Sequence, residues 1–102
     1  MTNKELRNSA LAKQRKYIAQ VAAKCNLDCT NAPNTEMVLE LIQDLDKDAF
    51  IILSKFLKAH NEWLNYTLAQ KEKDETEVGD PIYASLMLKR TQSEEKLKTY
   101  LG

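Results

Sequence analysis

Glycine and proline are so scarce in this chain that they divide it into long, uninterrupted segments. The 102 residues include two glycines and two prolines. Gly79 and Pro81 share one short tract, and Pro33 lies in a second tract, residues 27–34, which is rich in turn-forming side chains. Because both residue types interrupt helices, their absence elsewhere favours long helices. No segment shows the strict polar and apolar alternation of a half-buried strand.

The sequence predicts four helices, and these two tracts set the end of the first and the start of the fourth. The first covers about residues 3–26, where a helical stripe recurs every seven residues at Leu11, Ile18 and Cys25. The fourth runs from Pro81 to about Tyr100, because Gly79 ends the preceding helix and Asp80 caps the new one. Residues 91–93 are a weak point within it. Its predicted apolar side consists of Tyr83, Leu86, Met87, Leu97 and Leu101.

The two middle helices follow one another closely. Asn34 or Thr35 caps the second, whose predicted apolar face consists of Met37, Val38, Leu41, Ile42 and Leu45. The third begins near Asp46, with Asp48 in its first turn, and runs to about Gln70. The sequence leaves open whether the second and third helices are continuous. We therefore predict one all-α domain over residues 1–102, a bundle of three to four helices with a long central third helix. The charged segment 71–80 is a hinge or a fraying last turn.

The third helix is apolar over an unusually wide arc of roughly 200°. A surface helix of a globular protein needs a stripe of only about 100°. Two explanations remain open: the helix is central and covered by the other three, or one side binds a second copy or another protein. Because Trp and Tyr are favoured at interfaces, the predicted partner or self-association residues are Ile52, Phe56, Trp63 and Tyr66.

Catalytic and metal-binding patterns are weak throughout. Asp44, Asp46 and Asp48 alternate as at the start of a calcium loop, but the required glycine and glutamate do not follow. Cys25 and Cys29 lack two further ligands for zinc, since the chain has one histidine. That residue, His60, lies on the apolar side of the third helix, where a structural role is expected. With no glycine-rich phosphate loop, we predict no enzyme activity, no cofactor and no metal.

Charge is neutral overall but segregated along the sequence. Lys plus Arg and Asp plus Glu are 15 each, with basic residues concentrated before residue 28 and acidic residues between 29 and 49. The first helix could therefore bind nucleic acid through Lys4, Arg7, Lys13, Arg15 and Lys16, and this is the alternative hypothesis. A helix-turn-helix is a poor match, because Pro33 would break the recognition helix. The basic side chains could instead face solvent or an acidic neighbouring helix.

The remaining features favour a cytoplasmic interaction protein. The longest apolar run, residues 49–53, is far too short to span a membrane, and no signal peptide is visible, so the two cysteines are expected to be free thiols. The leading prediction is a small protein–protein interaction module, an adaptor, inhibitor or assembly factor, with homodimerisation as one option. Small helical chains of this kind are common among phage and mobile-element regulators, and such an origin is part of the prediction.

Overall fold

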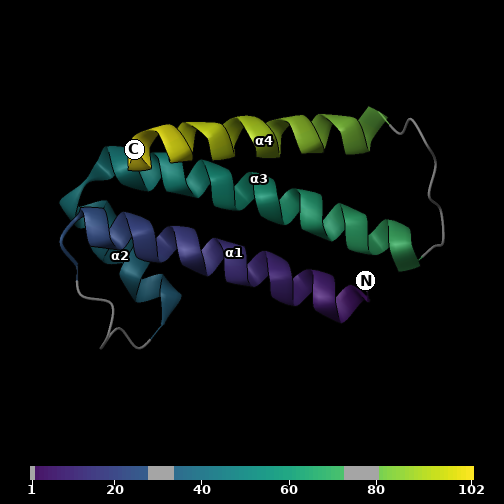
Figure 1. The fold of residues 1–102 in the computed structure, drawn as a ribbon, viewed down its shortest axis with the longest axis horizontal. Coiled ribbons are helices and arrows are strands. Elements are labelled where there is room, and N and C mark those ends of the chain that lie inside the picture. The colour runs from purple at the N-terminus through teal and green to yellow at the C-terminus, as the bar shows by residue number, and fades with distance from the viewer. Residues whose placement is uncertain (1, 28–33, 73–80) are drawn as a thin grey trace.

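The residues that the structure describes form four helices, packed in an elongated bundle of 44 × 25 × 19 Å. The computed structural model describes residues 2–27, 34–72 and 81–102, except for the side chains of residues 71 and 72. The helices are α1 (Asn3–Lys24), α2 (Thr35–Leu45), α3 (Lys47–Glu72) and α4 (Pro81–Leu101). Figure 1 shows α3 running antiparallel to both α1 and α4, with the shorter α2 packed at the end where α3 begins. The predicted all-α bundle and its long third helix are confirmed.

Asp46 separates the second helix from the third. Its backbone is extended (φ −149°, ψ 95°), and its side chain accepts a hydrogen bond from the backbone nitrogen of Ala49 at 3.1 Å. A capping carboxylate at this position replaces the missing helical acceptor and favours a new helix start. α2 and α3 are therefore two helices, and the predicted cap at Asp46 is confirmed. Asn34 caps α2 in the same way through the backbone nitrogen of Met37.

The end of α1 has the geometry of a Schellman motif. Asn26 adopts a left-handed backbone conformation (φ 61°), and the nitrogen of Leu27 donates to the carbonyl of Ala22 at 2.9 Å. Asparagine tolerates this conformation better than most residues, and Leu27 then packs against the core. The helix consequently ends at Lys24, slightly earlier than predicted.

The core is built around α3, which packs against all three other helices. Its inward side chains meet α1, α2 and α4 in a main cluster that includes Val21, Ile42, Leu53, Phe56 and Leu97. A smaller cluster of Ala10, Leu64 and Leu68 lies further along α1 and α3. The central position of α3 accounts for its wide apolar arc, which the sequence could also assign to self-association.

Several predicted apolar positions are exposed instead. Leu11 of α1 and Tyr83 of α4 are exposed, and Leu97 is the only buried residue of α4. The predicted weak point at residues 91–93 does not interrupt α4; the Ser93 hydroxyl donates within the helix to the Lys89 carbonyl. Gly79, Asp80 and the greater part of segment 71–80 lie outside the described residues.

None of the helices that the structure describes combines the length and the apolar character needed to cross a bilayer.

Candidate functional site

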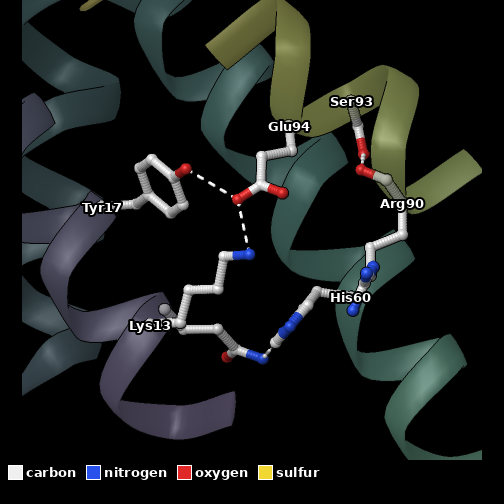
Figure 2. A network of polar contacts seen from close by, with 7 residues as sticks. Lys13, Tyr17, His60, Arg90, Ser93 and Glu94 are labelled. Atoms are coloured by element: carbon white, nitrogen blue, oxygen red, sulfur yellow. Dashed lines mark hydrogen bonds and ion pairs between the residues drawn. The ribbon is translucent and has the colours of Figure 1, made fainter. Parts of the chain in front are cut away.

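A polar network joins α1, α3 and α4 beside the core (Figure 2). The Glu94 carboxylate accepts hydrogen bonds at 2.7 Å from the Tyr17 hydroxyl and from the Lys13 ammonium group. Burial alone would raise the pKa of Glu94, but these donors outweigh it and hold the pKa below its usual value. Burial, followed by the contact with the Glu94 carboxylate, raises the pKa of Tyr17. The network therefore fixes α4 to α1 with a charged, half-buried acceptor.

His60 is enclosed by this network and does not face solvent. It is 1% exposed, and its ring stacks on Phe56 with a centroid distance of 5.2 Å. The Gln14 side-chain nitrogen lies 2.8 Å from Nδ1 and donates to it, so the neutral ring carries its proton on Nε2. Burial, with the nearby charges of Arg90 and Lys13, lowers the pKa of His60 to about 4. This is the structural histidine that the sequence predicts, buried more deeply than expected.

Arg90 of α4 contacts the α3 side of the network through Trp63. Its guanidinium lies over the ring of Trp63, 4.2 Å from the centroid, in a cation–π contact. Trp63 also packs beside His60 at 5.5 Å. These side chains hold helices together, and no hydroxyl or thiol is hydrogen-bonded to the His60 ring among the described residues. The arrangement thus provides packing and orientation rather than an activated nucleophile.

The predicted self-association residues do not form one surface patch. Phe56 is 0% exposed and lies in the core of the single chain, so it offers no surface to a partner in this fold. Trp63 lies under Arg90, and Tyr66 is half-buried. Ile52 is half-buried and lines a surface hollow between α3 and α4. Self-association itself remains a prediction, to be sought on another surface.

One side of α2 carries an exposed apolar stripe. Met37, Leu41 and Leu45 recur every four residues and are 44%, 44% and 60% exposed. Val38 and Ile42, on the neighbouring side, are buried against the core. Helical spacing places a stripe of carboxylates directly beside the exposed apolar stripe: Glu36, Glu40 and Asp44. The sequence predicted one apolar face of five residues here, but the structure covers only Val38 and Ile42.

A groove between α3 and α4 has the opposite charge. It has a volume of about 360 Å³ and is lined by Lys55 and Lys58 of α3 and by Lys89 and Lys96 of α4. Ile52 and Ala59 supply apolar lining, and Glu62 is the one carboxylate. A second hollow continues past Ile52 and Lys96 towards Tyr100. Sequence reasoning missed this groove because its lysines come from helices that only the fold brings together.

The predicted nucleic-acid residues are divided between two sides of α1. Lys4, Arg7, Arg15 and Lys16 are exposed, and helical spacing puts the first three on one face. Lys13 points to the other side and pairs with Glu94. The structure thus leaves a shorter basic face than the sequence predicted.

Metal-ligand geometry is not found in the part of the chain that the structure describes. No group of three or more His, Cys, Asp or Glu side chains gathers there in a way that could hold a metal ion. Cys25 is a half-buried free thiol, and Cys29 lies outside the described residues.

Comparisons with protein-family models, with curated proteins and with solved structures found no match.

Proposed function

We propose that this chain is a small cytoplasmic protein–protein interaction module that acts by surface contact without catalysis. The observation that carries the proposal is the uncovered face of α2, with three large apolar side chains in a row beside three carboxylates. Contiguous exposed apolar side chains with a polar border are typical of protein-binding surfaces. The α2 face therefore binds another protein chain.

The mode of action follows from the rest of the molecule. The polar network joins α1, α3 and α4, and one side of α2 is anchored against the core by Val38 and Ile42. A helix anchored in this way presents its apolar face with little loss of conformational entropy on binding. Such a module fits an adaptor, an inhibitor or an assembly factor. The small, helical, glycine-poor chain also supports our proposal of a phage or mobile-element origin.

A pull-down from the native host, followed by quantitative mass spectrometry, tests this function. Leu41→Asp should abolish capture of the specific partner, because it places a charge in the middle of the apolar stripe. Leu88→Asp is the matched control, since Leu88 is an exposed leucine of α4, far from α2 in the chain and 57% exposed. Equal capture by wild type and both variants would contradict the assignment of the α2 face.

A further inference from the structure

The groove between α3 and α4 is lined by four lysines but by only one carboxylate, so its lining carries a net positive charge. Among the residues that the structure describes, none of its four lysines forms an ion pair; the one ion pair there joins Lys13 and Glu94. Exposed lysines can be neutralised by solvent ions. However, a groove with an apolar lining and a single carboxylate is complementary to a surface that is both apolar and acidic.

The face of α2 has that combination of properties. Its apolar stripe is bordered along its whole length by carboxylates, and none of these forms an ion pair within the described part of the chain. Met37 and Leu45 are about 12 Å apart along the helix axis, and the α3 wall of the groove from Ile52 to Glu62 is about 15 Å long. A helix face of this length therefore fits the groove.

The two surfaces cannot meet within one chain. α2 packs against α1 and α3 and makes no contact with α4 in the described residues. Figure 1 shows α2 and α4 on opposite sides of α3. A contact between the α2 face and the groove must therefore join two molecules.

We propose that the α2 face of one copy docks into the α3–α4 groove of a second copy of this chain. The proposal rests on the proposed function, in which the α2 face is a contact surface, and it names the partner of that surface. The apolar stripe lies against Ile52 and Ala59, and the carboxylates of α2 face the groove lysines. Ile52, a residue that the sequence assigns to self-association, takes part in this contact.

Two charge-reversal variants test the pairing by sedimentation velocity. The α2 variant carries Glu36→Lys and Glu40→Lys, and the groove variant carries Lys58→Glu and Lys89→Glu. All four side chains are exposed, so the fold should be retained, which circular dichroism checks. At about 100 µM, where contacts of micromolar affinity are populated, wild type should sediment above the monomer mass of 11.7 kDa. Each variant alone should sediment as a monomer.

Mixing the variants gives the sharpest result. The α2 variant retains an intact groove and the groove variant retains an intact α2 face, so the equimolar mixture should form a one-to-one complex. A chain with all four substitutions should also associate, because both charges are reversed together. The control carries Lys4→Glu and Arg7→Glu on α1 and should associate like wild type. Association should weaken as salt is raised.

Three results would overturn the proposal. Wild type could remain a monomer at this concentration, or the mixture could stay as separate monomers although wild type associates. A labelled oligonucleotide could also bind to monomeric wild type and not to the groove variant, which would assign the groove to a polyanion. If wild type is monomeric while partner capture still depends on Leu41, the second-copy proposal fails and the proposed function stands. If neither association nor Leu41-dependent capture is seen, both fail.

Discussion

The side-chain nitrogen of Gln14 lies 2.8 Å from Nδ1 of His60 and joins α1 to the centre of α3. The same nitrogen donates to Asn61 at 2.7 Å, so both of its hydrogens are used. Gln14→Leu should destabilise the protein by about 1–3 kcal/mol, because the buried acceptor on His60 loses its donor. Urea unfolding measures the change, with Gln20→Leu at an exposed position of α1 as the control. Equal stability of both variants would show that the contact contributes nothing.

His60 should make the protein sensitive to mild acid. Its pKa is about 4 in the folded chain and near its ordinary 6.5 once unfolded. Between these values the unfolded chain binds a proton that the folded chain does not, so stability falls as the pH falls through this window. Once the pH is below 4, the free energy of unfolding should be lower by about 3 kcal/mol because of His60. Glu94, whose pKa is lowered, adds its own loss only below its ordinary value of 4.5.

A substitution at His60 separates its contribution to the pH dependence from that of Glu94. His60→Gln removes the titrating ring and keeps an acceptor for Gln14, so the dependence of unfolding free energy on pH should flatten between pH 6.5 and 5. Urea unfolding at several pH values is the measurement. An unchanged slope in this range would exclude His60 as its source.

Glu94 should matter far more than its neighbour Glu95. Glu94 accepts from both Tyr17 and Lys13, whereas Glu95 is exposed. Glu94→Gln should cost about 1–3 kcal/mol, because a charged acceptor shared by two donors is lost. Glu95→Gln should change stability by less than about 0.5 kcal/mol. Thermal unfolding compares the pair, and similar losses for both would argue against the network.

The two sides of α2 should respond differently to truncation. Ile42 is fully buried, so Ile42→Ala should cost about 2–5 kcal/mol. Leu41, one residue away, is 44% exposed, so Leu41→Ala should cost well under half of that. The comparison requires only chemical unfolding of the two variants. A larger loss at Leu41 would mean that the stripe is core and not a contact surface.

The nucleic-acid hypothesis gives a separate prediction. Because Lys13 is paired with Glu94, the remaining basic face of α1 is short, and we expect no gel mobility shift with DNA or RNA at physiological salt. Any shift at low salt should disappear when Arg15 and Lys16 are replaced by Glu. Tight binding that persists at physiological salt would place nucleic-acid binding ahead of protein binding.

The helices were largely predictable because their signals are local. Asn34 and Asp46 act as caps as predicted, and Pro81 begins α4. Periodicity also predicted the apolar side of α2, but it could not show that packing would cover Val38 and leave Leu41 exposed. That outcome depends on which helices lie beside α2. α1 and α3 pack against it, whereas α4 does not.

The polar contacts and the groove could not be predicted from the sequence either, because they depend on which helices pack side by side. Tyr17 and Glu94 are 77 residues apart, and no local pattern pairs them. The groove lysines are spaced on α3 and α4 as an ordinary solvated face would be. The wide apolar arc of α3 was visible, but its cover by three helices, with Phe56 fully buried, follows only from the tertiary structure.

Site-specific photo-crosslinking tests the central claim, that the α2 face is the contact surface, most directly. Benzoylphenylalanine placed at Leu41 should yield a discrete crosslinked adduct to another protein chain in the native host. The same probe at Leu88, an exposed leucine of α4, should yield none. An adduct from Leu88 alone, or no adduct from Leu41 in cells that contain the folded protein, would contradict the account.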